Sequence, residues 1–451
     1  MPVLRLRRRE HRPRRAPQPG RGPRLGERRG RLSTLQLLQG RPAPVRDGDA
    51  AGPSPGRAPA AHVGARRGAR RPGPLAALPR PGTPPTGVSA GPPVAVELRR
   101  VEVPLVAPIV AAHGVESVRK VVLVRVVDEE GRSGWGECEA LAAPTYTSEW
   151  HDGAWAVLRD HVVPAVLDGR PPKVVGHPMA WAAVEVALVD LSLRAADRRL
   201  VDVLGAARPA VASRAVVGIA TDPDALVHAV GERIAAGHRA VKLKIRPGAD
   251  VEPLRAVRSA WPHLALAADA NGSYDLDAAQ ALLRAVDDMG LDHVEQLLPA
   301  GDLVGAARLR QLTDVPLALD ESLVRADDLA AAVALGAVDV VNLKPARVGG
   351  LTAATEVARV AREAGLRVLC GGMYELGVGR AVSLAVAGSV LVSDGADIGP
   401  TSAYVRRDLV PPIELDADGA LPVPHGPGIG VTPDAAVLED VTVERWVGER
   451  R

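Results

Sequence analysis

The chain has 451 residues, with 56 Lys and Arg against 53 Asp and Glu, for a formal net charge of +3. This near-neutral figure hides two unlike segments: residues 1–93 hold 20 Arg and only four acids, whereas the remainder holds 36 basic and 49 acidic residues. The isoelectric point near 9.0 therefore reflects the first segment, and the acidic remainder excludes a basic nucleic-acid-binding fold. Because no apolar stretch reaches membrane-spanning length and there are only two cysteines, we expect a cytoplasmic protein without a disulfide scaffold.

Residues 1–93 are predicted to be a disordered, Arg/Pro-rich leader. They contain 18 Pro and no Phe, Tyr or Trp, and such a segment has too little large apolar surface to offset the entropy of ordering. A secretory signal is excluded, since no apolar run of the needed length follows Arg5–Arg9. We expect an extension upstream of the true start, with Val88, Val94 or Val96 as alternative initiation positions.

Residues 94–208 are predicted to form an α+β unit. Alternating apolar residues, separated by turns rich in Gly and charge, predict strands over 95–103, 120–128 and 134–138. Helical periodicity follows over 149–166 and 180–193.

Residues 209–400 alternate between short β-branched runs and Ala/Leu-rich helical runs. The predicted strands are 211–219, 240–245, 264–270, 293–298, 316–321, 339–344 and 367–371, with a short eighth strand over 396–399. The predicted helices include 225–236, 277–289, 303–312, 326–335 and 352–364. Strict alternation implies parallel strands with right-handed crossovers, and such units closing on themselves form a modified (β/α)7β TIM-type barrel. An open doubly wound sheet is the alternative, but no GxGxxG follows the first strand.

Charged residues stand at the ends of five consecutive predicted strands. Lys244 is followed by Asp269 after 25 residues, Glu295 after 26, Asp320 after 25 and Lys344 after 24. This spacing equals the length of one strand–helix unit, so these side chains are expected to converge at the C-terminal face of the barrel, where active sites of this fold lie. Lys242 precedes Lys244 by two positions, and strand alternation puts both on one face.

The three carboxylates of Asp269, Glu295 and Asp320 are predicted to bind a metal ion. Gathered over a barrel mouth, they would repel one another unless a cation lay among them. An all-oxygen ligand set selects a hard ion, best Mg²⁺ with Mn²⁺ as a substitute. The structural alternative is three separate salt bridges with the lysines at 242, 244 and 344.

Other residues of the strand ends are candidates for substrate binding. Asn271 shares the inward face with Asp269, although a structural turn competes as an explanation. Gly372 and Met373 follow the seventh strand and are expected to line the pocket, with close packing as the alternative. A Lys beside a cation can become partly neutral, so Lys244 could take a weakly acidic proton while the metal held the resulting enolate.

These motifs resemble the enolase superfamily, in its muconate-lactonizing subgroup. The superfamily resemblance rests on Lys242-Leu-Lys244, Asp269-Ala-Asn271, Glu295-Gln296, Asp320-Glu321-Ser322 and the run 344–350, and it covers nearly all of 95–435. Gly134-Trp-Gly-Glu-Cys138, Pro144-Thr-Tyr146 and the run 371–380 resemble more narrowly the o-succinylbenzoate synthase family, which includes N-acylamino acid racemases.

The resemblance implies a role for each candidate residue. It implies that the first α+β unit caps the barrel, that residues 401–451 return to this cap, and that loops 106–115 and 141–150 shape the substrate site. Asp269, Glu295 and Asp320 would be the Mg²⁺ ligands, and Lys244 the acid/base. Lys242 would hold the substrate carboxylate. Lys344 would stabilise an enediolate or act on the opposite face.

The reaction implied by the resemblance is o-succinylbenzoate synthesis, a syn dehydration in menaquinone biosynthesis. N-acylamino acid racemisation at the same two lysines is the alternative, followed by a muconate-type cycloisomerase and a non-catalytic binding barrel. The expected partner is a small carboxylate substrate, without nucleic acid or membrane. The sequence leaves open whether the chain forms a homo-oligomer.

Overall fold

The computed structural model describes residues 93–111, 114–219 and 222–450, which all belong to one compact unit. The predicted disordered leader lies outside the described residues except for Pro93, so its disorder stays a prediction. Within the described part of the chain, no helix is both long and apolar enough to cross a membrane.

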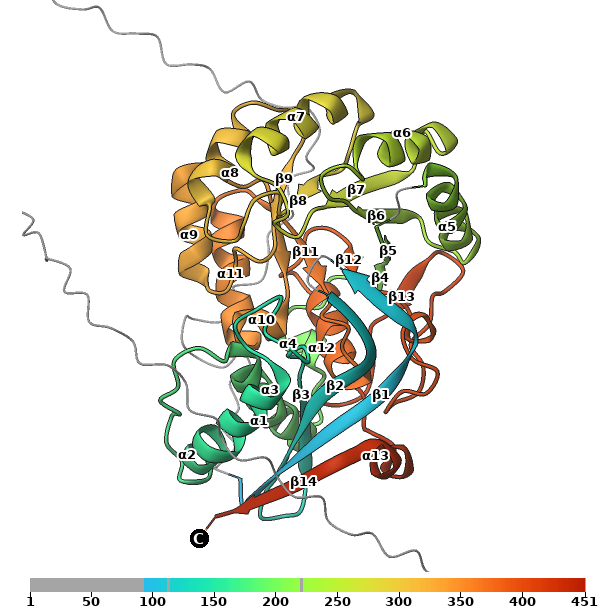
Figure 1. Cartoon of the computed structure of the whole chain (residues 1–451). Coiled ribbons are helices and arrows are strands. Elements are labelled where there is room, and N and C mark those ends of the chain that lie inside the picture. The colour runs from blue at the N-terminus through green and yellow to red at the C-terminus, as the bar shows by residue number, and fades with distance from the viewer. Residues whose placement is uncertain (1–92, 112–113, 220–221, 451) are drawn as a thin grey trace, which may run out of the picture. The chain divides into compact units, whose positions relative to one another are not determined.

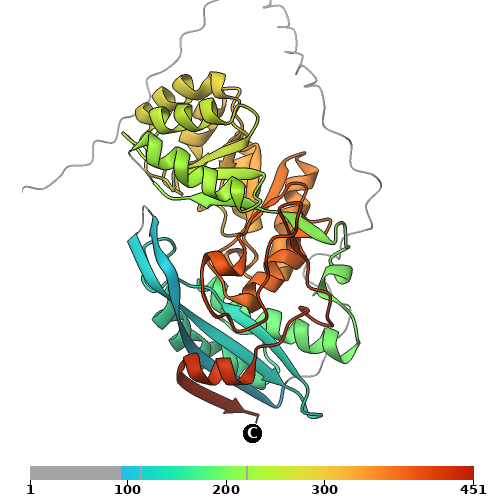
Figure 2. The same ribbon diagram turned by 90° about the vertical axis from the view of Figure 1, so that its right-hand side faces the viewer.

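A four-stranded antiparallel sheet forms the cap, in the order β14-β1-β2-β3. Its strands are β1 (Ala95–Ala111), β2 (Gly114–Val127), β3 (Ser133–Cys138) and β14 (Thr442–Glu449). The sheet is accompanied by α1 (His151–Val157), a π-helical turn (Leu158–Val162), α2 (Val163–Leu167) and α3 (Pro178–Ala195). In both views β14 runs beside β1, so the C-terminal segment completes a sheet begun more than 300 residues earlier (Figures 1 and 2).

The first expected substrate-shaping loop, 106–115, is largely strand instead. β1 and β2 pair continuously from Ala95 to Pro104, and after a register shift the pairing resumes between Ile109 and Glu116. Pro104 and Pro108 are typical of a loop in the sequence. In the structure, however, the two strands continue beyond both prolines after an irregularity in their register. His113, within this predicted loop, lies outside the described residues.

Eight parallel strands form the second sheet, in the order β12-β11-β10-β9-β8-β7-β6-β5. The strands are β5 (Arg214–Val217), β6 (Ala240–Lys244), β7 (Ala265–Asp269), β8 (Val294–Glu295), β9 (Leu317–Leu319), β10 (Val340–Leu343), β11 (Arg367–Gly371) and β12 (Ala396–Asp397). A parallel bridge between Ser213 and Ala396 joins the two edge segments, so the sheet closes on itself. The predicted (β/α)7β barrel with an α+β cap is confirmed, and the open doubly wound alternative is wrong.

The barrel helices lie outside the strands, as Figure 1 shows for α5 to α9. They are α5 (Pro223–Ala235), α6 (Val251–Ala260), α7 (Leu276–Val286) with a 3-10 turn (Asp287–Met289), α8 (Leu303–Arg310), α9 (Ala326–Leu335), α10 (Pro345–Val348), α11 (Leu351–Glu363) and α12 (Gly377–Ala387). Aliphatic side chains fill the core, as the absence of Phe requires. The smaller elements are α4 (Leu200–Val203), β4 (Ala210–Ala212), β13 (Ala420–Pro422), a 3-10 turn (Thr401–Ala403) and α13 (Ala435–Val441).

The predicted strand over 211–219 is split in two. Residues 210–212 form β4, which pairs with β13 rather than with the barrel. Barrel pairing begins only at Arg214, opposite Ala240. The apolar run does not show this division, because both halves are equally β-branched and only their partners differ.

The cap is joined to the barrel by a buried carboxylate on α3. Glu185 accepts the Leu351 and Thr352 N–H groups, at 2.6 and 3.1 Å, and so satisfies the first turn of α11. Gly350 precedes that helix with φ +105° and ψ −167°, a region essentially restricted to glycine, and a Cβ there would lie 1.9 Å from Glu185 Oε2. The two helices can approach only because this position carries no side chain.

Gly350→Ala is therefore expected to lower the free energy of unfolding by about 3 kcal/mol or more, through backbone strain and displacement of Glu185. Gly365→Ala is the matched control, because Gly365 also has a positive φ, of 69°, but nothing lies within 4 Å of the point that an alanine Cβ would occupy there. We expect the control to lose only about 1 kcal/mol. Urea unfolding measures both, and equal losses would contradict the proposed contact.

A second buried carboxylate, Glu149, caps the start of α3. It accepts the Met179 and Ala180 N–H groups, each at 2.8 Å, and His177 lies 3.7 Å away. Burial raises the pKa of Glu149 to about 7, although the two N–H groups favour the charged form. The folded protein thus holds a proton on Glu149 at pH values where the unfolded chain has released it, and stability contributed by this group falls as pH rises from about 4.5 to 7.

Glu149→Gln is expected to weaken that pH dependence. Between pH 5 and pH 8 the wild type should lose up to about 3 kcal/mol more stability than the variant. Urea unfolding at the two pH values measures the difference. Glu252→Gln, at an exposed position in the first turn of α6, should show the wild-type dependence. Parallel pH profiles for wild type and Glu149→Gln would show that Glu149 does not titrate in this range.

Candidate active site

The charged strand ends lie at one height of the barrel. In the parallel register Lys244 is paired with Asp269, and Asp269 with Glu295. Two residues with left-handed backbone follow these strands, Asn271 with φ 44° and Gln296 with φ 40°. The chain therefore turns away directly after each carboxylate, which leaves the carboxylate at the strand end.

Lys242 lies among three carboxylates. Its Nζ is 3.0 Å from each Glu295 carboxylate oxygen, 2.6 Å from Asp397 Oδ2 and 3.4 Å from Asp269 Oδ2. Only 4 % of the Lys242 side chain is exposed, so these charges interact in a desolvated site. Asn342 adds an N–H donor to Glu295, at 2.9 Å.

Lys244 is held at its tip by two oxygens. Its Nζ donates to Asp269 Oδ2 and to Asn271 Oδ1, both at 2.7 Å. The other oxygen of Asp269 accepts the Asn271 N–H at 3.0 Å, so a local turn fixes the carboxylate. Asn271 in turn donates to Glu321 at 2.8 Å. Asn271 therefore forms the turn that was the alternative explanation for this residue. The Asn271 side chain also contacts Lys244 in the pocket.

Asp320 is the centre of a second charged group. Its carboxylate accepts from Lys344 Nζ at 2.8 Å, from the Tyr146 hydroxyl at 2.8 Å, and from the Arg347 guanidinium. Lys344 also contacts the Tyr146 hydroxyl, at 2.7 Å. Tyr146 comes from the cap loop after β3, so the cap contributes directly to the site. The side-chain oxygen of Gln296 accepts the Asp320 N–H at 3.0 Å and thereby positions its backbone.

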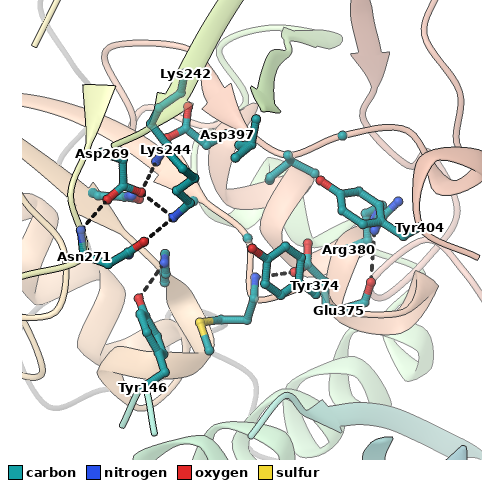
Figure 3. Close-up of a pocket in the computed structure, with 18 of the residues that line it drawn as sticks. Tyr146, Lys242, Lys244, Asp269, Asn271, Tyr374, Glu375, Arg380, Asp397 and Tyr404 are labelled. Atoms are coloured by element: carbon teal, nitrogen blue, oxygen red, sulfur yellow. Dashed lines mark hydrogen bonds and ion pairs between the residues drawn. The ribbon is translucent and has the colours of Figure 1, made fainter. Parts of the chain in front are cut away.

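A pocket lies over these residues, with an empty space of about 640 Å³ when its open mouth is included. Seven of the nine predicted site residues line it: Lys242, Lys244, Lys344, Asp269, Asn271, Gly372 and Met373. Glu295 and Asp320 do not line the pocket and lie buried beneath the lysines. Figure 3 shows Lys244, Asp269 and Asn271 on one side of the cavity, and Tyr374 and Tyr404 on the other.

The three predicted metal ligands fit a divalent cation by chemistry and by strand position. All are carboxylates, and they come from the ends of consecutive strands. Each is paired here with a Lys or Arg side chain, and within the described residues no three acidic, His or Cys side chains converge in a metal-binding arrangement. In this structure the carboxylate oxygens that would bind the cation accept hydrogen bonds from Lys242, Lys244 and Lys344. A bound cation would therefore have to displace these ammonium groups.

The charges of the site shift one another's pKa values. Burial disfavours the charged form of Glu295, but Lys242 outweighs burial and lowers the pKa of Glu295 to about 2. Burial likewise opposes ionisation of Asp320, yet Arg347 and Lys344 hold its pKa well below the usual range. Burial alone would lower the pKa of Lys244, but the Asp269 carboxylate raises it above its ordinary value. A partly neutral Lys244 therefore requires that Asp269 be engaged by another cation.

Three residues of the site were not singled out from the sequence as functional. Asp397 contacts Lys242, and it lies 53 residues, or two strand–helix units, after Lys344, with the uncharged Gly371 at the end of the strand between them. Asn342 could have been predicted from the sequence, because it precedes Lys344 by two positions and so shares its strand face, as Lys242 does with Lys244. Tyr146 belongs to the motif Pro144-Thr-Tyr146, but nothing in the sequence places a cap loop against Asp320.

Comparison with known proteins agrees with this geometry. Residues 94–205 match the mandelate racemase / muconate lactonizing enzyme N-terminal domain, and residues 225–437 match the enolase C-terminal domain-like family. An N-succinylamino acid racemase from Amycolatopsis is 42 % identical over 365 residues, covering 78 % of this chain and 98 % of the relative. An o-succinylbenzoate synthase from Geobacillus kaustophilus is 37 % identical over 357 residues, covering 77 % and 95 %.

Solved structures give the same relationship. An enolase superfamily member from Listeria innocua superposes with a TM-score of 0.75 at 30 % identity, covering 80 % of this chain and 100 % of that one. A probable mandelate racemase from Alicyclobacillus acidocaldarius gives 0.73 at 36 % identity, covering 79 % and 99 %. The chain therefore belongs to the enolase superfamily, in the family that contains o-succinylbenzoate synthases and N-succinylamino acid racemases.

Proposed function

We propose that the protein is an o-succinylbenzoate synthase, which removes water from a cyclohexadiene carboxylate in menaquinone biosynthesis. The observation that carries the proposal is the placement of two amines around one pocket. Lys244 ends β6 and Lys344 follows β10, four strands away in a closed sheet of eight, so they approach a substrate from opposite sides. Support also comes from synthases at 32–37 % identity over most of the chain.

In this proposal Lys244 removes the proton next to the substrate carboxylate. Its Nζ lies at the pocket surface, and Asp269 and Asn271 fix its direction. The same amine then returns the proton to the departing hydroxyl, which makes the elimination syn. The Lys344 ammonium stabilises the negative charge of the enediolate, and Lys242 orients the substrate carboxylate.

Members of this superfamily generally use a divalent metal, and we propose Mg²⁺, with Mn²⁺ as a substitute. Asp269, Glu295 and Asp320 would hold it. When bound, the cation supplies positive charge for the anionic substrate and competes with Lys244 for Asp269, which lowers the pKa of Lys244 toward a value suited to a base. The hard carboxylate oxygens of these three residues favour such ions.

Racemisation of N-succinylamino acids is the second candidate. The Amycolatopsis relative, at 42 % identity, carries that name. The same two amines would serve it, with one removing the α-proton and the other delivering a proton to the opposite face. Unlike the synthase reaction, racemisation requires both Lys244 and Lys344 to exchange protons with the substrate.

Assaying purified protein on both substrates separates the two functions. Dehydration is followed by the absorbance of o-succinylbenzoate, and racemisation by the optical rotation of an N-succinylamino acid, each with Mg²⁺ added. A kcat/KM for dehydration at least a hundredfold below that for racemisation would overturn the synthase proposal. Activity on neither substrate would overturn both. We also propose a cytoplasmic location, where cysteines such as Cys138 and Cys370, both free and buried, stay reduced.

A further inference from the structure

One wall of the pocket is an irregular segment, residues 372–376, between β11 and α12. Gly372, Met373, Tyr374 and Glu375 all line the cavity. Tyr374 has a left-handed backbone, with φ 57°, which costs an ordinary side chain about 1–2 kcal/mol. Such a conformation persists only where surrounding contacts determine it.

Charged side chains make those contacts, and two of them belong to the cap. Within the barrel, Glu375 accepts the Met373 N–H at 2.6 Å and Arg380 donates to the Glu375 carbonyl at 3.0 Å. From β3 of the cap, Glu137 accepts the Leu376 N–H at 2.7 Å and the Gly379 N–H at 2.8 Å. The conformation of this wall thus depends on residues more than 230 positions earlier in the chain.

Arg119, on β2 of the cap, reaches two walls at once. Its Nε donates to the Tyr374 carbonyl at 2.8 Å. Its other nitrogens donate to the Glu139 carbonyl at 2.5 Å and the Ala140 carbonyl at 3.4 Å. Those two residues lead directly into Leu141 of the cap, which also lines the pocket.

Because Arg119 is buried, losing these hydrogen bonds would cost free energy. The side chain is 0 % exposed, so water cannot replace the carbonyl oxygens that it contacts. The guanidinium presents its donors on three nitrogens in a fixed planar fork, whereas the donors of an ammonium share one nitrogen and cannot match three carbonyls spaced for that fork. Fixing a cap loop and a barrel loop with one rigid group also fixes the distance between them.

We propose that Arg119 is a positioning residue that sets the width of the substrate pocket between the cap loop at Leu141 and the barrel wall at Met373–Tyr374. The proposal rests on the proposed function for the identity of the substrate. Figure 3 shows Tyr374 across the cavity from Lys244, Asp269 and Asn271. The loss of Arg119 should therefore alter KM and side-chain preference much more than the proton-transfer step.

Arg119→Met tests the proposal, because it keeps an unbranched apolar stem and removes all the donors. We expect KM to rise at least tenfold with kcat changed less than threefold. The kcat/KM ratio between N-succinylphenylalanine and N-succinylalanine should move at least tenfold toward one. Amide hydrogen exchange, followed by mass spectrometry, should become at least tenfold faster in peptides covering both 139–146 and 372–379. Arg125→Met, on the same strand but 37 % exposed at its side chain, is the control and should leave all three measurements unchanged.

Arg119→Lys distinguishes a clamp from a buried charge. Since the ammonium cannot hold both walls, this variant should behave like Arg119→Met. Wild-type selectivity and wild-type hydrogen exchange in Arg119→Lys would overturn the proposal. If Arg119→Met does not fold, Arg119→Lys decides the question. Exchange that is accelerated in only one of the two peptides would also overturn it. If the wild type turns over neither the cyclohexadiene carboxylate nor an N-succinylamino acid, the proposed function fails, while the exchange measurement still decides whether Arg119 joins the walls.

Discussion

Lys244→Ala is expected to lower the rate of α-proton exchange in a bound carboxylate substrate by about a thousandfold. General acid–base catalysis by one positioned side chain contributes about 10²–10⁴ in rate, and Lys244 is the amine that Asp269 and Asn271 hold at the pocket surface. Proton exchange is measured by NMR as deuterium incorporation from D₂O. This readout reports the base itself, whichever of the two reactions follows.

Two controls make this result specific. Lys173→Ala removes an exposed lysine outside the pocket and should exchange protons at the wild-type rate. Binding of Mg²⁺ to Lys244→Ala, measured by calorimetry, should be retained, because the carboxylates of Asp269, Glu295 and Asp320 are unchanged. Deuterium incorporation by Lys244→Ala at the wild-type rate would show that another group is the base.

The barrel could be predicted because its signal repeats. Strand ends 24–26 residues apart carry one charged residue each, and a closed parallel sheet brings residues at equal positions together. The register between Lys244, Asp269 and Glu295 follows from this regularity. Asp397 follows Lys344 by two such units, but the strand between them, β11, ends at the uncharged Gly371, which interrupts the series of charged strand ends.

Contacts between the cap and the barrel could not be predicted in the same way. Tyr146 with Asp320, Glu185 with Leu351, and Arg119 with Tyr374 each join segments that are more than 160 residues apart. No periodicity relates such segments, so the sequence offered only a resemblance for Tyr146 and nothing for Arg119. The hairpin over 106–115 was misjudged for a related reason, since its prolines are visible in the sequence while the pairing that overrides them is not.

Asp320→Ala is expected to abolish activity and also to lower the free energy of unfolding by about 3–5 kcal/mol. The carboxylate neutralises two cations, Lys344 and Arg347, and all three residues are at least nine-tenths buried. Removing one partner of a buried ion pair leaves an uncompensated charge, which typically costs that amount. Asp440→Ala is the control, since it breaks an exposed ion pair with Arg407 that contributes at most about 1 kcal/mol.

A second substitution separates the two roles of Asp320. In the Asp320→Ala background, Arg347→Met removes one of the stranded cations, so unfolding in urea should show recovery of about 1–2 kcal/mol. Activity and Mg²⁺ affinity should stay lost, because the proposed ligand is still missing. If the double variant were no more stable than Asp320→Ala, buried charge would not explain the loss. If Asp320→Ala still bound Mg²⁺ as tightly as the wild type, Asp320 would be a partner of Arg347 and Lys344 alone and not a metal ligand.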